Sequence, residues 1–342
     1  MNLNDILALP DNPSFDEFLH IRALILDRAN PPRDFSESNL YAALPLVCPE
    51  LAPLRTASAL PKSAHRCHIA ESFLSALGLD QAARGRCGIS RGVRESLGVL
   101  FRAAKRVGAR VAIPSDVYPT YRSLAEFAGI SEASVAWSAR DGDIDAAKHA
   151  DWILVCDPIK PWGGKSSEMA ALELANWAEA SEGRLLIADL AYDNHYESQF
   201  LKLARRGQAC VLTSLSKGWL SPWVCGICIW PSAAPAGLRD DFAKLRKDER
   251  LLREAFHCLE NLPERPKEVS SACMSLAGDA IKAIPEEFTK GSNFEGYFMT
   301  CDRSWKAALA SDLLTLPASV FGSVKPGCVF SCLPSTMHLA KV

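Results

Sequence analysis

Short apolar runs alternate with amphipathic stretches through the middle of the chain. A run without polar interruptions is typical of a strand covered on both faces, as in a parallel sheet between two layers of helices. The last run follows the one before it after a short connection, which allows antiparallel pairing. The pattern predicts an α/β fold with a mostly parallel sheet and helices on both faces. The expected strands are residues 110–114, 152–156, 184–188, 209–213 and 224–230.

Two segments next to these runs have helical periodicity. Residues 92–107 carry one apolar stripe, with Glu95 in the first turn and Gly108 directly after the last, where helices favour an acid and a glycine. A second helix is expected to be opened by Ser166 or Ser167 with Glu168 behind them. The residues of this second helix that we expect to point inward are Met169, Leu172 and Ala175.

The two ends of the chain have weaker patterns. Residues 1–60 contain recurring prolines and only about 14–29 has helical periodicity, so we expect this stretch to wrap over another element or subunit. Residues 235–265 are expected to form a charged helix with a solvated face, and 302–314 a shorter amphipathic piece. We therefore predict an N-terminal arm that also joins a small domain (1–60), a large ligand-binding domain (61–235) and a small α+β C-terminal domain (236–342).

Composition excludes several classes of function. The formal net charge is −2, from 38 basic and 40 acidic residues, so there is no basic footprint for nucleic acid or for a membrane surface. No apolar run is long enough to cross a bilayer, and the first residues lack the layout of a signal peptide. The 12 cysteines are scattered through apolar segments, which predicts reduced thiols in a cytoplasmic protein.

Two clusters of potential metal ligands carry no metal prediction. His65, Cys67 and His68 lie close together, but no second Cys/His pair follows at a zinc spacing. Cys225 and Cys228 form a lone CxxC inside an expected strand, where the two thiols point to opposite faces. We therefore expect neither a metal site nor a redox role for the CxxC.

Polar residues follow the expected strands at the points where these end. In a parallel sheet these points share one edge, where ligands bind. A Gly-rich turn at Cys87–Gly92 precedes the 92–107 helix and suits a phosphate group. A lysine at the end of a buried strand is costly unless it is paired, neutralised or used in chemistry. The residues that we expect to converge are Tyr118, Tyr121, Lys160, Asp189, Tyr192, Ser214, Ser216 and Lys217.

Several of these residues also have an ordinary structural explanation. Lys217 alone fits a strand exit with a solvated side chain, and Asp189 fits a helix N-cap. Tyr192 fits a core residue with its hydroxyl at the surface, and Tyr118 fits ordinary packing. The case for a site rests on the order of four motifs, each at the end of an expected strand: 115–121, 157–164, 189–192 and 214–217.

Taken together, the motifs resemble those of the fold-type-I pyridoxal-phosphate enzymes, specifically the class I/II aminotransferase family. The resemblance covers residues 85–230, with a weaker similarity at 313–333. It implies that Lys217 forms a Schiff base with pyridoxal 5'-phosphate, that Asp189 pairs with the ring nitrogen, and that Tyr192 bonds the ring oxygen. These three would be the catalytic residues. It also implies that the ring stacks on Tyr118 and that the phosphate is bound by Gly92, Val93, Arg94, Ser214 and Ser216.

Three positions depart from the family pattern. Lys160 stands where the family has an asparagine that touches the ring oxygen, and a cation there can still favour the phenolate. Residues 223–226 contain no arginine where the family has one that clamps the phosphate; Arg91 or Arg94 is a possible replacement. Phe330 occupies the best match to the arginine that grips the substrate carboxylate.

The resemblance implies a homodimer that acts on a small amino acid or amine, with an aminotransferase as the leading hypothesis. A PLP-dependent lyase, decarboxylase or cyclase of a specialised pathway is the alternative that the missing arginines favour. A catalytically degenerate homologue with a binding role is a third hypothesis, against which the retention of Lys217, Asp189 and Tyr192 argues. The substrate itself stays open.

Overall fold

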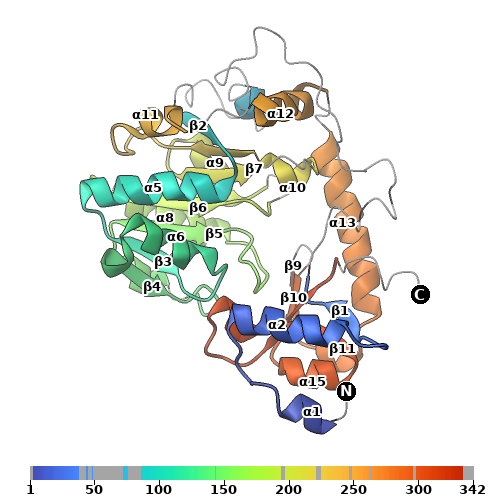
Figure 1. Cartoon of the computed structure of the whole chain (residues 1–342). Coiled ribbons are helices and arrows are strands. Elements are labelled where there is room, and N and C mark those ends of the chain that lie inside the picture. The colour runs from blue at the N-terminus through green and yellow to red at the C-terminus, as the bar shows by residue number, and fades with distance from the viewer. Residues whose placement is uncertain are drawn as a thin grey trace.

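The computed structural model describes residues 3–37, 44, 48, 72–75, 86–142, 144–193, 197–220, 225–245, 249–261, 264–295 and 298–333. These residues form two lobes, each built on one sheet (Figure 1). The large lobe has the seven-stranded sheet. In spatial order its strands are β2 (Cys87–Ser90), β8 (Gly226–Ile229), β7 (Cys210–Ser214), β6 (Leu185–Asp189), β5 (Trp152–Cys156), β3 (Val111–Pro114) and β4 (Ser134–Trp137).

The predicted strands of the large sheet are confirmed to within one or two residues at each end. Strands β3 to β7 pair parallel, and β8 pairs antiparallel with both β7 and β2. Every residue of β5, β6 and β7 is buried, which explains why these strands appear as unbroken apolar runs. The predicted α/β fold class, a mostly parallel sheet with helices, is therefore confirmed.

Helices cover both faces of this sheet, with α5 and α6 on one side and α8 and α9 on the other (Figure 1). The predicted 92–107 helix is α5, and Gly108 ends it with φ +70°. Of the two serines expected at the start of α8, Ser167 is the cap, since its hydroxyl accepts from the backbone N–H of Ala170. The described helices of this lobe include α5 (Val93–Val107), α6 (Thr120–Ala128), α7 (Ile144–Ala147), α8 (Glu168–Glu179), α9 (Gln199–Arg205) and α10 (Leu215–Gly218), with a 3₁₀ turn at Ser131–Ala133.

The inward direction predicted for Met169 is wrong. Its side chain is 79% exposed, and the buried stripe of α8 runs through Ala171, Leu174, Ala175 and Trp177. Met169 lies two positions before Ala171, so the two side chains point about 200° apart around the helix axis. The sequence periodicity therefore predicts the wrong buried face for the first turn of this short helix.

The Gly-rich turn expected at Cys87–Gly92 is mostly a strand. Cys87–Ser90 is β2, so only Arg91 and Gly92 make the turn, with Gly92 at φ +102°. The glycines here serve close packing: a Cβ atom at Gly88 would lie 2.3 Å from the Phe242 ring. Likewise, a Cβ atom at Gly226 would lie 2.5 Å from the carbonyl carbon of Gly92. The backbone of Gly226, in β8, can therefore pack directly against the Gly92 turn.

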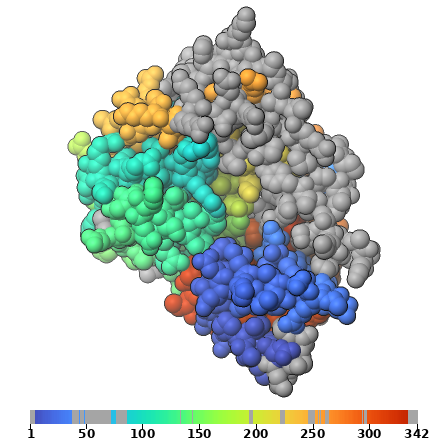
Figure 2. Space-filling model, in the orientation of Figure 1, coloured from blue at the N-terminus to red at the C-terminus, as the bar shows by residue number. Residues whose placement is uncertain are grey.

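The small lobe joins the two ends of the chain (Figures 1 and 2). Its sheet has the order β1 (Arg33–Phe35), β11 (Leu313–Pro317), β12 (Cys328–Ser331), β10 (Phe298–Cys301) and β9 (Asn293–Glu295), and β1 pairs parallel with β11. The predicted helix at 14–29 is α2 (Phe15–Leu26), opened by a capping box between Ser14 and Glu17. The lobe also contains α1 (Leu3–Leu7), α15 (Trp305–Ala310) and a 3₁₀ turn at Ala318–Phe321.

The single charged helix expected over 235–265 is wrong. The segment contains two helices, α11 (Leu238–Ala243) and α12 (Glu249–Asn261). Leu238 and Phe242 of α11 are buried where α11 packs on α5 and β2, whereas α12 buries a stripe of its own, including Ala255 and Cys258. Helices α13 (Arg265–Lys282) and α14 (Glu286–Thr289) follow, and α13 runs past both lobes (Figure 1). The predicted domain boundaries at residues 60 and 235 stay predictions.

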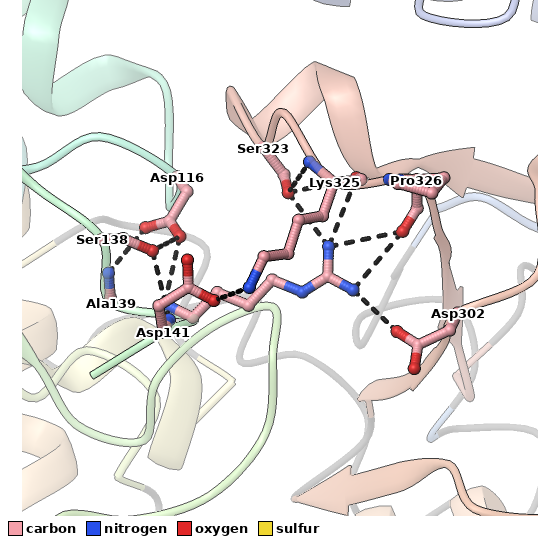
Figure 3. Close-up of polar contacts among 9 residues, drawn as sticks. Asp116, Ser138, Ala139, Asp141, Asp302, Ser323, Lys325 and Pro326 are labelled. Carbon is pink, nitrogen blue, oxygen red and sulfur yellow. Dashed lines mark hydrogen bonds and ion pairs between the residues drawn. The ribbon is translucent and has the colours of Figure 1, made fainter. Parts of the chain in front are cut away.

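An arginine from the large lobe joins the two lobes. The Arg140 guanidinium donates to Asp302 at 2.8 Å, to the Ser323 hydroxyl at 3.0 Å and to nearby carbonyls, and Lys325 pairs with Asp141 (Figure 3). The same guanidinium lies 4.6 Å from the centroid of the Trp162 ring.

None of the helices in the described part of the chain has both the length and the hydropathy needed to cross a membrane.

Candidate active site

A cavity of about 390 Å³ opens at the carboxyl ends of β5, β6 and β7. Its volume is in the range of small-molecule sites. Every residue that the sequence predicts for the site lines this cavity: Gly92, Val93, Arg94, Tyr118, Lys160, Asp189, Tyr192, Ser214, Ser216 and Lys217. The fold therefore brings together residues that lie as far apart in the chain as 92 and 217.

Lys217 is placed by the short helix α10. Ser214 ends β7 and caps α10, since its hydroxyl accepts from the backbone N–H of Ser216 at 3.2 Å, and the two hydroxyl oxygens are 2.7 Å apart. The Lys217 ammonium nitrogen lies 5.3 Å from the centroid of the Tyr192 ring. Burial, followed by the charge of Arg94, lowers the pKa of Lys217 below its usual value. A larger fraction of this amine is therefore neutral, and so nucleophilic, than for a surface lysine.

Asp189 is a buried carboxylate at the end of β6. One oxygen accepts from the Tyr121 hydroxyl at 2.7 Å, and the other from the backbone N–H of Ala191 at 2.9 Å. Burial raises the pKa of Asp189, although both hydrogen bonds and the charge of Lys160 act in the opposite direction. Burial also raises the pKa of Tyr121 well above its usual value, with Asp189 as the second cause. A cationic ligand group at Asp189 would relieve the cost of this buried charge.

Lys160 is a second amine in the cavity, beside Lys217. Its ammonium nitrogen lies 3.5 Å from the centroid of the Tyr192 ring and 4.2 Å from that of Phe298, a small-lobe residue of β10. Within the described residues no carboxylate forms a salt bridge with Lys160. Burial, and next the charge of Lys217, lower the pKa of Lys160 well below its usual value. Burial also raises the pKa of Tyr192 to about 12, with Asp189 as a further cause.

The loop that carries Lys160 is held at both ends. Asp157 accepts from the backbone N–H of Ser166 at 2.8 Å and from the Ser198 hydroxyl. The Trp162 indole donates to the carbonyl of Asp116 at 2.6 Å, and the carbonyl of Trp162 accepts from the hydroxyl of Thr300 in β10 at 3.2 Å. The peptide bonds before Pro158 and Pro161 are cis. Both lobes therefore position Lys160.

Two arginines flank the mouth of the cavity, and the structure distinguishes them. Arg91 makes a two-pronged ion pair with Glu95, from its Nε at 3.0 Å and its Nη2 at 2.9 Å, and its side chain is 52% exposed. Arg94 instead donates to the Tyr118 hydroxyl and lies 5.3 Å from the centroid of that ring. Among the described residues no carboxylate pairs with Arg94. Of these two arginines, Arg94 is therefore the one whose charge is available to an anionic ligand.

Known structures share this arrangement of elements. The search found the L,L-diaminopimelate aminotransferase from Chlamydomonas reinhardtii, with a TM-score of 0.68 and 16% identity over 98% of this chain and 95% of that chain. It also found the aspartate aminotransferase double mutant 1 from Thermus thermophilus, with a TM-score of 0.70 and 15% identity over 97% and 95%. The histidinol-phosphate aminotransferase from Clostridium acetobutylicum gives 0.64 and 15% over 88% and 94%. The chain has the fold of the fold-type-I aminotransferases.

Sequence comparison gives a weaker signal than the fold. A Bacillus subtilis (strain 168) protein named "Putative aminotransferase YugH" is 26% identical over 197 residues, which are 53% of this chain and 50% of that protein. The chain thus spans about half the length of this curated relative. No family model matches the chain. The fold therefore relates this chain to aminotransferases over more of its length than the sequence similarity does.

Two of the three departures from the aminotransferase pattern are missing arginines, one at 223–226 and one at Phe330. Of the stretch 223–226, where the phosphate arginine is missing, residues 223 and 224 lie outside the described residues. Phe330 is fully buried in β12, with its ring centroid 5.7 Å from that of Phe35 and 5.9 Å from that of Phe288. It belongs to the core of the small lobe and is absent from the cavity lining.

Two contacts that shape the site are not predicted by the sequence. Tyr121 is among the residues expected to converge, but the sequence does not identify it as the partner of Asp189; its position three residues after Tyr118 is the available signal. Phe298 had no signal, because it reaches the site from the other lobe. Among the described residues no group of three potential ligands could hold a metal ion, while His65, Cys67 and His68 lie outside the described residues.

Proposed function

We propose that the chain is a pyridoxal 5'-phosphate-dependent aminotransferase that acts on an amino acid or amine. The observation that carries the proposal is the placement of Lys217 and Asp189. They lie at the carboxyl ends of the neighbouring strands β7 and β6 and line one cavity, in a chain with the fold-type-I aminotransferase fold. Proteins of this fold found in the comparisons are named as aminotransferases.

The residues that line the cavity fit the cofactor group by group. The first turn of α5 presents backbone N–H groups that have no partner inside the helix, and Arg94 and the two serine hydroxyls add donors for a phosphate. Asp189 offers a buried carboxylate for a protonated ring nitrogen, and Tyr118 an aromatic face at the cavity edge. Lys217 supplies a partly neutral amine. When bound, the cofactor supplies an electron sink for the reaction.

Each proposed role follows from the chemistry of the side chain. Lys217 would hold the cofactor through its Nζ atom and, once released by the substrate, would take a proton from the reacting substrate carbon and deliver it to the cofactor carbon. Asp189 keeps the ring nitrogen protonated, because the charge pair is buried. Tyr192 and Lys160 lie together and would orient the ring oxygen and stabilise its negative charge. The apolar walls, including Leu97 and Leu124, limit access of water.

The direct test of the reaction is a screen of amino donors, each with and without a keto acid. Transamination needs the acceptor in every cycle, whereas elimination or decarboxylation does not. We expect product formation from at least one donor to continue past one turnover only when a keto acid is present. Turnover of the donor that continues unchanged without any keto acid would contradict an aminotransferase and favour a lyase or decarboxylase.

Arg94 is proposed to bind the phosphate in place of the arginine that the family pattern expects. Replacing it by glutamine should weaken binding of pyridoxal phosphate by about 10–100-fold, the range for a lost hydrogen bond to a charged group. Binding of pyridoxal, which has no phosphate, should change little. Arg91→Gln is the matched control, because Glu95 already pairs with Arg91. Titration of both ligands into the three proteins measures this; equal weakening of pyridoxal and its phosphate by Arg94→Gln would contradict the role.

Assembly and location are proposed on narrower grounds. On the family resemblance alone we propose a homodimer, which sedimentation at several concentrations would test. We also propose a cytoplasmic location. Every cysteine that the structure describes is a free thiol, as is usual in a reducing compartment.

A further inference from the structure

Two cysteines face each other across the small-lobe sheet, outside the proposed active site. Cys301, the last residue of β10, pairs directly with Cys328, the first residue of β12, in an antiparallel ladder. Directly opposed residues of such a ladder point to the same face, with their Cα atoms about 4.5–5.5 Å apart. A disulfide spans Cα separations of about 4.4–6.8 Å. The two sulfur atoms can therefore be linked with little movement of the backbone.

The surroundings of the two thiols make them chemically unequal. Cys301 is partly exposed, whereas Cys328 is buried. Cys328 lies opposite Cys301 in the ladder, and the backbone N–H of Arg303 donates to the Cys301 sulfur at 3.4 Å. The neighbouring Cys328 thiol, and after it the N–H and the charge of Arg303, lower the pKa of Cys301 to about 6 although partial burial opposes them, whereas Cys301 and burial raise the pKa of Cys328. Cys301 is therefore the more acidic and the more accessible thiol, and Cys328 is the buried thiol opposite it.

We propose that Cys301 and Cys328 form an oxidation site, at which a hydroperoxide converts the two thiols into a cross-strand disulfide. The Cys301 thiolate attacks the peroxide, so that an S–O bond forms, the O–O bond breaks and the leaving oxygen becomes water or an alcohol. The Cys328 sulfur then attacks the Cys301 sulfur, so that the S–S bond forms and water leaves with the thiol proton. The two thiols supply the two electrons that reduce the peroxide.

The position of the pair connects it to the contact between the lobes. Cys301 lies between Thr300, which donates to the carbonyl of Trp162, and Asp302, which pairs with Arg140 (Figure 3). Trp162 belongs to the loop that carries Lys160. A disulfide at Cys301 would thus restrict the motion of this end of β10, where Thr300 contacts the loop.

The chain contains a second close pair of thiols that serves as an internal control. The sulfur atoms of Cys210 and Cys228 are 3.7 Å apart, but both residues are fully buried in the large sheet. Burial raises the pKa of Cys228 well above its usual value. Each pair joins two adjacent strands, whereas access to solvent and thiolate character differ between the pairs. We therefore expect the Cys301–Cys328 pair to react and the Cys210–Cys228 pair to stay reduced.

The experiment treats the folded, reduced wild-type protein with one equivalent of hydrogen peroxide, alkylates the remaining thiols and maps the tryptic peptides by mass spectrometry. Cys301 lies on peptide 291–303, and Cys328 on peptide 307–341 together with Cys332, because Lys325 precedes a proline. We expect the two peptides to be linked by a disulfide that dithiothreitol removes. In Cys332→Ser the link should persist, which assigns it to Cys328.

Two further variants test the order of the steps. Cys328→Ser should stop at a sulfenic acid on Cys301 that a 1,3-dione probe captures, and Cys301→Ser should give neither the link nor the captured adduct. Absence of the 291–303 to 307–341 link in wild type, loss of the link in Cys332→Ser, or a Cys210–Cys228 link formed first would overturn the proposal. The wild-type digest decides the question even where a variant folds poorly.

Discussion

Replacing Lys217 by methionine is expected to lower amino-group transfer by about 10⁴-fold or more, the upper range for loss of a positioned acid–base group. The substitution removes both the amine that would hold the cofactor and the group that would move the proton. Methionine keeps most of the length and the apolar stem, so the short helix α10 and the hydrogen bond between Ser214 and Ser216 should persist. Steady-state transfer from a good amino donor to a keto acid measures the effect.

Lys160→Met is the matched control for this prediction. It removes the other amine of the cavity, which lies against the same Tyr192 ring and whose pKa burial also lowers. Because Lys160 is proposed only to orient the ring oxygen and stabilise its charge, its loss should cost about 10–100-fold. A Lys160→Met enzyme that is as inactive as Lys217→Met, or a Lys217→Met enzyme within tenfold of wild type, would contradict the assignment.

Asp189→Asn is expected to lower transfer by about 10²–10³-fold, from the roughly 2–5 kcal/mol that removal of one partner costs a buried charge pair. Asparagine has nearly the same shape and can still accept from Tyr121 or Ala191, but it cannot keep the ring nitrogen protonated. Asp193→Asn is the control, since Asp193 is also buried with a raised pKa but does not line the cavity.

The same variant predicts a change in pH dependence. Burial raises the pKa of Asp189 above the usual 3.8, so as pH falls its carboxylate is protonated at a higher pH than a surface aspartate would be. Only the charged form pairs with a ring cation. Cofactor affinity should therefore be retained above this raised pKa and be lost as pH falls through it. In Asp189→Asn this step should disappear; its persistence there would assign the step to another group.

The parts of the fold that the sequence predicts are those in which consecutive residues have a clear hydrophobic pattern. Strands β5, β6 and β7 are buried on both faces, so each leaves an unbroken apolar run. Strands β1 and β9 have only three residues each, and β1 finds its partner β11 at the other end of the chain, so no local pattern marks them. Helix α13 was missed because much of its buried side consists of small residues, such as Ala272 and Ala277, which give a weak periodicity.

For the site, the ordered motifs predicted which residues lie together but not their partners. The predicted residues line one cavity because each lies at or just after the end of a strand of one mostly parallel sheet. The tie between Tyr121 and Asp189 joins residues 68 positions apart, and Phe298 comes from the small lobe, so both depend on the folded chain. The pairing of Cys301 with Cys328 depends on strand register, which the apolar pattern of these short strands does not define.

The role proposed for Lys217 is tested most directly by locating the lysine that holds the cofactor. The wild-type protein is loaded with pyridoxal phosphate, reduced with borohydride and digested with trypsin. We expect the adduct on Lys217, in a peptide covering residues 207–239 because trypsin does not cut at the modified lysine. An adduct on Lys160, in peptide 149–165, or no adduct at all after saturation with the cofactor, would contradict it.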